Sequence, residues 1–266
     1  MNFNERLRLT CIDKNNRLCI GLDVDNNSLN NNSLDYMNSY IKDIIISTID
    51  ICPVYKINFS FYERYGSKGY KILEKIPEYV NSKSILIADA KRGDIGNSSK
   101  FYAESIFNYL GYDSVTVSPF MGSDSIEPFI NYKEKGVFIL ALTSNPGSND
   151  FQKKLINNKE LYKYVIEMCN KLNKYKNVGL VIGATNDDEL DEVDSASDPM
   201  PWLMPGIGFQ GGNLEKSLIV GEKNYLSLVN VSRGILNFKD RKISDIRESA
   251  LNYTNKIREI LWKVKK

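Results

Sequence analysis

Short apolar runs alternate with longer segments of helical periodicity along almost the whole chain. The runs are rich in Val, Ile and Leu, which is typical of strands that are buried on both faces of a parallel sheet. The pattern predicts eight strands: Leu18–Leu22, Val54–Asn58, Ser84–Ala88, Ser114–Val117, Val137–Leu142, Val178–Ile182, Trp202–Met204 and Ser227–Val231. The seventh strand is the shortest, and a proline stands on each side of it.

Apolar residues between these runs recur at the spacing of amphipathic helices. One such stripe comprises Leu34, Met37, Ile41, Ile44, Ile45, Thr48 and Ile49, and another comprises Ile243, Ile246, Ala250, Ile257, Ile260, Leu261 and Val264. After the third strand, Asn97 or Ser98 is a candidate helix cap, and Gly111 is a candidate for closing that helix. The acidic run Asp187–Asp194 is interpreted as an exposed helix start or face.

Eight strand–helix units in a chain of 266 residues predict an α/β fold, the (β/α)8 TIM barrel. A doubly wound open sheet is the alternative, but no GxGxxG motif follows the first strand. No linker or composition change marks a boundary, so we expect a single domain over residues 1–266. The Asn-rich stretch Asn26–Ser33 predicts a solvated loop with no assigned function.

The composition restricts the class of protein. The chain carries 35 basic and 33 acidic side chains, a balance that does not favour a nucleic-acid or membrane-surface partner. The N-terminal residues lack the apolar core of a signal peptide, and no apolar run approaches the ~18 residues of a membrane-spanning helix. We therefore expect a soluble protein of the cytoplasm.

Histidine is absent, which excludes Ser-His-Asp and Cys-His catalytic systems and every His-containing metal site. Acid–base chemistry must then use Lys, Asp, Glu, Tyr or Cys. The four cysteines, Cys11, Cys19, Cys52 and Cys169, show no CxxC spacing. We interpret them as reduced, buried thiols, although counting alone leaves a disulfide open.

A cluster of charges is predicted at the ends of the first three strands. The sequence DAKRGDIGNSS directly follows the third strand, and alternation along a strand turns Asp89 and Lys91 the same way, with Asp94 just beyond. Asp23 follows the first strand and Lys56 lies in the second. Barrel enzymes carry their chemistry at the C-terminal ends of the strands, so these side chains are candidates for a catalytic site.

The last two strands are followed by residues suited to an anion. The glycine-rich sequence PGIGFQGG follows the seventh strand, and Arg233 follows the eighth. This is the usual place of a phosphate site in such a barrel, where backbone N–H groups and an arginine hold the anion. A lone glycine-rich loop or a single strand-end charge more often has a structural role. Their coincidence at one end of the barrel favours a functional site.

Together these motifs resemble the orotidine 5′-phosphate decarboxylase family. The sequence DAKRGDIGNS is similar to its DxKxxD signature, a pattern shared with related sugar-phosphate barrels. The likeness covers almost the full chain, and the other matching segments are GLDVD at 21–25, YKINF at 55–59, TSNPG at 143–147, PGIGFQGG at 205–212 and VSRGI at 231–235.

The resemblance implies roles for individual residues. It implies catalytic roles for Lys56, Asp89, Lys91 and Asp94, and substrate binding by Asp23, Ser98, Ser144, Pro205, Gln210, Gly212 and Arg233. Lys91 would donate a proton to C6 of the pyrimidine, and Asp89 would lie beside the substrate carboxylate. Asp23 and Lys56 would contact the ribose side of the nucleotide.

The resemblance also implies contacts with the rest of the nucleotide and with a second subunit. Ser144 would read the pyrimidine edge, while Gln210 and Arg233 would hold the phosphate. Asp94 and Ser98 would reach into the active site of a partner, which implies a homodimer with shared sites. The chain departs from the family at two positions: Ser98 replaces an expected threonine, and Ser232 replaces a glycine common before the arginine.

The implied reaction converts orotidine monophosphate (OMP) to uridine monophosphate (UMP), the last step of de novo UMP synthesis, without a metal or other cofactor. A fusion or association with orotate phosphoribosyltransferase is left open. One alternative is a Mg²⁺-dependent sugar-phosphate decarboxylase or synthase of the same superfamily, and another is a non-catalytic nucleotide-binding barrel. Lys56 and the DIGNS and TSNPG sequences favour the nucleotide enzyme, and the complete set of charges argues against a barrel without catalysis.

Overall fold

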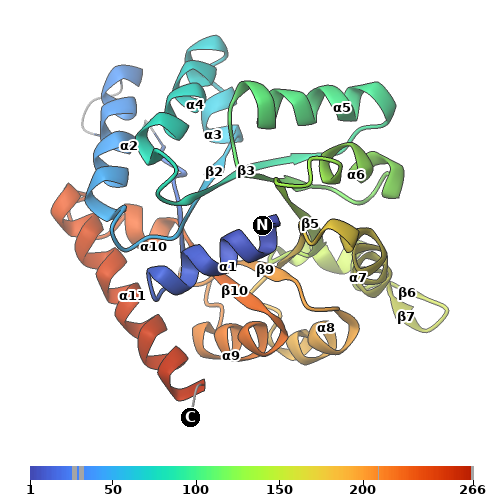
Figure 1. Ribbon diagram of the computed structural model, residues 1–266. Helices are drawn as coiled ribbons and strands as arrows, with labels where there is room; N and C mark the ends of the chain where they lie inside the picture. The colour runs from blue at the N-terminus through green and yellow to red at the C-terminus, as the bar shows by residue number, and fades with distance from the viewer. Residues whose placement is uncertain (26–28, 30–32, 209, 265–266) are drawn as a thin grey trace.

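The computed structural model describes residues 1–25, 29, 33–208 and 210–264, and these form a closed barrel of parallel strands surrounded by helices (Figure 1). Around the barrel the strands follow the order β1-β10-β9-β8-β5-β4-β3-β2. Their bounds are β1 Leu18–Gly21, β2 Val54–Asn58, β3 Ile85–Arg92, β4 Ser114–Val117, β5 Gly136–Leu142, β8 Val178–Ile182, β9 Pro201–Pro205 and β10 Leu226–Val231. The predicted TIM barrel is confirmed, and each predicted strand is present.

Two strands extend beyond their predicted ends. The third was expected to end at Ala88, but β3 continues to Arg92, which pairs with Val117 of β4 after a shift in register. The charged residues were expected to follow the strand, and Asp89 to Arg92 instead belong to it. The seventh, β9, includes both Pro201 and Pro205, which were expected to lie outside. Residue type alone predicted the ends of β3 and β9 too early and the start of β9 too late, because pairing with a neighbouring strand extends both strands.

Helices cover the outside of the barrel and follow most strands. The α-helices are α1 Phe3–Asp13, α2 Leu34–Thr48, α3 Ser60–Glu63, α4 Ser67–Val80, α5 Gly96–Glu104, α6 Ser123–Ile130, α7 Leu161–Leu172, α8 Leu190–Ala196, α9 Leu214–Asn224, α10 Arg233–Leu236 and α11 Ile243–Val264. Shorter elements are the π-helix η2 Ser105–Tyr109, the 3₁₀ turns η3 Pro146–Asp150, η4 Asn173–Tyr175 and η5 Asp187–Glu189, and the antiparallel strands β6 Leu155–Ile156 and β7 Lys159–Glu160. Both predicted apolar stripes lie in helices, α2 and α11. The acidic run forms η5 and the start of α8, as expected.

The start of α5 corrects one prediction. The chain enters this helix at Gly96 from the extended Ile95, with no side-chain cap, so Asn97 and Ser98 lie in its first turn and cap nothing. Gly111 does stand where the helical segment stops, past η2, with a φ of +77°. Most of the Asn-rich stretch 26–33 lies outside the described residues, as does Phe209 in the glycine-rich sequence.

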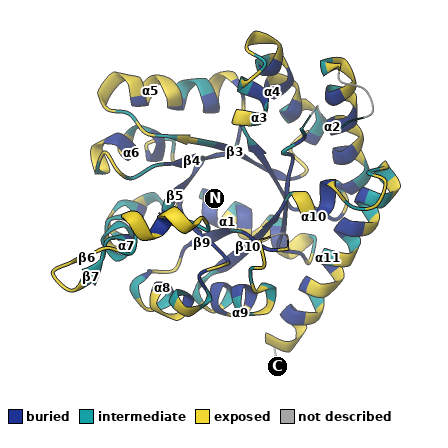
Figure 2. Cartoon of the chain, turned by 180° about the vertical axis from the view of Figure 1, so that it is seen from behind, coloured by how far each residue is buried: buried dark blue, intermediate teal, exposed yellow. Residues whose placement is uncertain are grey.

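Two apolar cores are present. The larger lies between the barrel and the helices around it. The smaller fills the barrel interior and continues into α1, whose Phe3 and Leu7 are almost completely buried against it. Both views show α1 crossing the barrel at its centre, and the buried interior surrounds it in Figure 2. This helix was not predicted, because its apolar face is narrow, and it closes the N-terminal end of the barrel.

The four cysteines are buried and free, as expected. Among the described residues, no helix has the length and apolar character needed to cross a membrane.

Candidate active site

A cavity of about 740 Å³ opens at the C-terminal ends of the strands. Its size lies within the ~300–1,000 Å³ range of small-molecule sites. Eight of the eleven predicted site residues line it, namely Asp23, Lys56, Asp89, Lys91, Ser144, Pro205, Gln210 and Arg233. The structure therefore brings the charges of the first three strands and the residues of the last two to one cavity.

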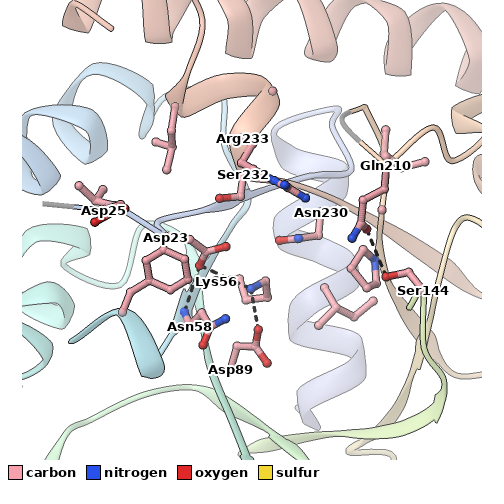
Figure 3. Close-up of a pocket in the computed structure, with 18 of the residues that line it drawn as sticks. Asp23, Asp25, Lys56, Asn58, Asp89, Ser144, Gln210, Asn230, Ser232 and Arg233 are labelled. Carbon is pink, nitrogen blue, oxygen red and sulfur yellow. Dashed lines mark hydrogen bonds and ion pairs between the residues drawn. The ribbon is translucent and has the colours of Figure 1, made fainter. Parts of the chain in front are cut away.

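A chain of alternating charges runs along one wall of this cavity. The Lys56 Nζ lies 2.7 Å from Asp89 Oδ2 and 3.8 Å from Asp23 Oδ1. The Lys91 Nζ lies 2.6 Å from Asp89 Oδ1, so Asp89 bridges the two lysines. Figure 3 shows Lys56 between Asp23 and Asp89, with each side chain turned toward the next. Lys56 and Asp89 are buried, whereas the side chain of Lys91 is 49% exposed and can meet a ligand.

The buried pair stays ionised because each charge faces an opposite one. Burial alone would lower the pKa of Lys56, but the carboxylates of Asp23 and Asp89 outweigh it and raise that pKa above its ordinary value. Burial alone would raise the pKa of Asp89, but Lys56 and Lys91 outweigh it and hold that pKa well below the usual range. Removing Lys56 or Asp89 would leave the other member of this buried pair less compensated, whereas Asp89 keeps Lys56 when Lys91 is removed.

Lys91 is held in an uncommon backbone conformation. Its φ of +46° lies in the left-handed region, where a residue other than glycine is strained. Its backbone N–H donates to Thr116 Oγ1 at 3.0 Å, and that hydroxyl donates to Asp89 Oδ1 at 2.9 Å. The neighbouring Arg92 is fixed by Glu63, 2.5 Å from its Nη2. Asp89 and Lys91 meet, as alternation predicted, but in a strand with irregular register rather than a regular one.

The opposite wall carries the residues predicted to bind the base edge and the phosphate. The Ser144 hydroxyl donates to Gln210 Oε1 at 3.2 Å, which joins the ends of β5 and β9 (Figure 3). Gly206 has a φ of +106°, a conformation that favours glycine and turns the loop back toward the cavity. The Gly212 N–H donates to the Gly206 carbonyl at 3.0 Å, so Gly212 shapes this loop without lining the cavity.

Asp94 and Ser98 do not line the cavity of their own chain. Asp94 Oδ1 accepts the N–H of Ile95 at 2.8 Å, just before α5, and Ser98 is exposed in the first turn of that helix. Exposed apolar side chains occur just before α5, on α5 and on the segment after β4: Ile95, Phe101, Tyr102, Phe120 and Met121.

Comparison with known proteins identifies the family. The sequence profile of the Orotidine 5'-phosphate decarboxylase / HUMPS family matches residues 16–245. The chain belongs to this family. Orotidine 5'-phosphate decarboxylase of Dehalococcoides mccartyi is 43% identical over 244 residues, 89% of each chain. The enzyme of that name from Flavobacterium johnsoniae is 38% identical over 97% of each chain.

Solved structures of decarboxylase-family proteins share the fold. Leishmania donovani OMP decarboxylase superimposes with a TM-score of 0.87 at 34% identity, covering 98% of this chain and 99% of that one. Leishmania donovani UMP synthase gives a TM-score of 0.88 at 36% identity, covering 98% of this chain and 56% of that one. The resemblance found in the sequence motifs is therefore confirmed.

Several polar residues of this decarboxylase-family cavity were not among the predicted site residues, and three of them lie in the barrel strands: Asn58, Thr116 and Asn230. The Asn58 N–H donates to Asp23 Oδ1 at 3.3 Å, and Thr116 joins Asp89 to Lys91. The signal that could have found them is a single polar residue at an inward position of an otherwise apolar strand.

The departure at Ser232 has a structural counterpart. A Cβ on Gly21 would lie 2.8 Å from the Ser232 Cβ, so the absence of a side chain at position 21 leaves room for the serine. The Ser232 hydroxyl is buried and makes no hydrogen bond within the described part of the chain. The serine is thus accommodated between β1 and the start of α10.

Proposed function

We propose that this protein decarboxylates OMP to UMP, the last step of de novo UMP synthesis. The observation that carries the proposal is the Lys56–Asp89–Lys91 chain, which presents a half-exposed ammonium to a nucleotide-sized cavity. Membership of a decarboxylase family supports it. The reaction needs a fixed cation beside the carbon that loses CO2, and Lys91 supplies one.

The arrangement of the walls supports one orientation of the nucleotide. Arg233 and Gln210 hold the phosphate above β9 and β10, where a guanidinium and a glycine-rich loop meet. Asp23 and Lys56 bind the ribose hydroxyls, and Ser144 reads the pyrimidine edge. Pro205 packs against the ring, and Gly212 keeps the loop in shape. The reacting carbon then lies over Lys91.

The proton transfer balances without a cofactor. The bond between C6 and the carboxylate carbon breaks, CO2 leaves, and the electron pair stays on C6. Lys91 Nζ donates a proton to that carbon and becomes a neutral amine. Because its side chain is half-exposed, water can restore the proton after the product leaves. The ammonium stabilises the developing negative charge before the transfer, which is the main electrostatic contribution.

Asp89 acts through its fixed negative charge. It lies next to Lys91 and stays ionised, so it keeps the ammonium oriented and stands beside the leaving carboxylate. Repulsion between the two carboxylates would be relieved when CO2 departs. Phosphate binding at Arg233, remote from the reacting carbon, supplies energy to hold the base in this position.

We further propose that the active protein is a homodimer with shared sites. Asp94 and Ser98 do not line the cavity of their own chain, and the same segment carries the exposed apolar side chains of Ile95, Phe101 and Tyr102, with Phe120 and Met121 exposed after β4. Monomeric proteins seldom expose such a group, which is typical of a protein interface. A second copy covering it would receive Asp94 beside its own Lys91.

Mixing two inactive variants tests the shared site. Lys91→Ala and Asp94→Ala would each be inactive alone, and hybrid dimers would contain one intact site. We expect up to about a quarter of wild-type activity after random mixing, from the statistics of subunit exchange in a closed dimer. No recovery, with dimers shown by sedimentation, would contradict the sharing of sites.

The remaining expectations complete the proposal. Residues 1–266 form one domain that works in the cytoplasm. Association with an orotate phosphoribosyltransferase, which would supply OMP, stays a prediction that co-purification can test.

The decisive experiment follows the loss of OMP absorbance with purified protein, with and without EDTA. We expect turnover that EDTA does not reduce, because the proposed proton transfer uses only side chains. A Mg²⁺-dependent sugar-phosphate enzyme of the same superfamily would not turn over OMP, and EDTA would abolish its activity on its own sugar phosphate. Binding of OMP without turnover would indicate the non-catalytic barrel.

A further inference from the structure

Asn230 is a polar residue at an inward position of β10, close to the floor of the cavity. Alternate strands of such a barrel place their inward side chains in a shared tier. Here β2, β4, β8 and β10 contribute Lys56, Thr116, Val181 and Asn230, and all four line the cavity. Figure 3 shows Asn230 between the lysine and the Ser144–Gln210 wall.

One end of the Asn230 amide is already engaged. Its Oδ1 accepts the thiol hydrogen of Cys19, with Sγ 3.6 Å away, and Cys19 is its register partner on β1. Burial raises the pKa of this thiol well above its ordinary value, so the sulfur keeps its hydrogen and stays a donor. With the oxygen held by Cys19, the amide nitrogen is turned toward the cavity.

The other end of the amide has no partner among the residues that the structure describes. Asn230 is only 7% exposed, yet its Nδ2 donates no hydrogen bond to any residue that the structure describes. Nδ2 is not among the fully buried polar atoms that lack a partner, and Asn230 lines the cavity, so this donor is open to the cavity. A ligand that displaces water from it must supply an acceptor in return. Lys56 and Thr116 in the same tier are both satisfied, by Asp89. Asn230 is therefore the member of the tier whose hydrogen bond is still to be made.

We propose that the Asn230 amide donates a hydrogen bond to an oxygen on the pyrimidine ring of the bound nucleotide. This inference rests on the proposed function. Arg233 holds the phosphate after β10, whereas Asn230 lies three residues earlier in the strand and deeper in the barrel. The part of the ligand that reaches this depth is the base. Its ring oxygens are acceptors, which the N–H donor complements.

Binding of two ligands separates this role from a structural one. UMP carries the ring, and ribose 5-phosphate carries only the sugar and the phosphate. In Asn230→Ala we expect UMP to bind about tenfold more weakly. In Asn230→Asp, which is nearly isosteric, the loss is larger because a carboxylate repels the ring oxygens. Ribose 5-phosphate should bind all three proteins within about twofold, as titration calorimetry would show.

A matched substitution controls for general damage to the fold. Asn173 is also buried, and its Oδ1 accepts the N–H of Val178 outside the cavity. Asn173→Ala should lower the melting temperature while leaving the ratio of UMP to ribose 5-phosphate affinity unchanged. Within the tier, Cys19→Ser keeps a donor to Asn230 and should preserve the ratio, whereas Cys19→Ala should reduce it about two- to threefold.

The outcomes separate this inference from the proposed function. Wild-type protein that binds UMP, with Asn230 variants that bind it equally well, overturns the inference alone. An equal loss for UMP and ribose 5-phosphate overturns it too, because the contact would not involve the ring. Wild-type protein that neither binds UMP nor turns over OMP overturns the proposed function, and the pyrimidine as partner of Asn230 with it.

Discussion

The two ends of this barrel are made from the same strands and differ in almost every physical respect. At the N-terminal end, α1 closes the interior, and Phe3 meets Phe138 edge to face at a centroid distance of 6.3 Å. At the C-terminal end, the interior opens into a cavity with charged side chains on its wall. The change occurs within single strands, since Val54 belongs to the apolar core and Lys56, two residues later, to the charged chain.

This contrast teaches that stability and chemistry are separated along the strand axis. Apolar packing at the closed end needs only matching shapes and no particular partner. Each charge at the open end depends on a specific neighbour, and Lys91 also has a strained backbone. Substitutions at the two ends should therefore fail in different ways.

The largest expected effect comes from Lys91→Ala at the open end. Loss of the proposed proton donor should reduce kcat/KM for OMP by about 10⁴-fold. The unfolding free energy should change by about 1 kcal/mol or less, because the lost ion pair is half-exposed. Initial rates with OMP and urea unfolding measure the two quantities. Substantial residual turnover in the pure variant would rule out the proton-donor role.

Phe3→Ala at the closed end should show the reverse behaviour. Removing this buried ring should lower the unfolding free energy by about 3–5 kcal/mol, because the cavity under α1 cannot fully collapse. Below the melting temperature, kcat/KM should stay close to wild type. Urea unfolding and initial rates test this. A large fall in activity of the folded variant would show that the two ends are coupled.

Arg233→Ala compares two parts of the open end, the proposed phosphate site and the chain of charges. It removes the guanidinium that we propose holds the phosphate but leaves the chain of charges on β2 and β3 intact. We expect kcat/KM to fall by about 100-fold, through both weaker binding and slower turnover. Steady-state kinetics with OMP checks this, and guanidinium ion added to the assay should restore part of the turnover. Unchanged kinetics would show that Arg233 does not bind the phosphate.

The smallest expected effect is on the pH dependence of the unfolding free energy, to which Asp89 at the open end contributes and Phe3 at the closed end does not. Burial opposes ionisation of Asp89, but Lys56 and Lys91 outweigh it and lower its pKa in the folded state. Its stabilising contribution is therefore complete above about pH 4 and is lost as the pH falls toward the folded-state pKa. Between pH 4 and pH 2 the wild-type unfolding free energy should fall more steeply than that of Asp89→Asn, by up to ~1.4 kcal/mol per pH unit.

Phe3→Ala provides the matched control for this measurement. Phenylalanine does not titrate, so the unfolding free energy of Phe3→Ala should depend on pH in the same way as that of the wild type. Parallel curves for Asp89→Asn and wild type would contradict the ionised, stabilising state of Asp89.

The sequence predicted the barrel because its strands are short, apolar and regularly spaced. It predicted the charges of Asp23, Lys56, Asp89 and Lys91 at one cavity because parallel strands end on the same side of a sheet. It did not predict α1, because this helix has few apolar residues and they are buried only by packing against the end of the barrel that they close.

The details of the site depend on contacts between distant residues. The left-handed backbone of Lys91 coincides with the register shift between β3 and β4, and the local sequence does not predict this conformation. Thr116 and Asn230 are single polar residues in apolar strands, and their importance follows from what faces them across the barrel. The expectation that Asp94 and Ser98 serve a partner concerns a surface that a single chain leaves uncovered.

The position of α1 also has a consequence for how the chain folds. It precedes every strand, yet Asn4 bonds to Val178, 174 residues away, and Arg6 to Asp113, 107 residues away. The barrel itself closes only when β1 pairs with β10, as in Leu18 with Val229. Contacts of such sequence separation form slowly, because loop closure must come before any gain in packing. During synthesis α1 cannot dock until strands that are made much later have formed. The cavity is therefore completed only when the last strand pairs with the first.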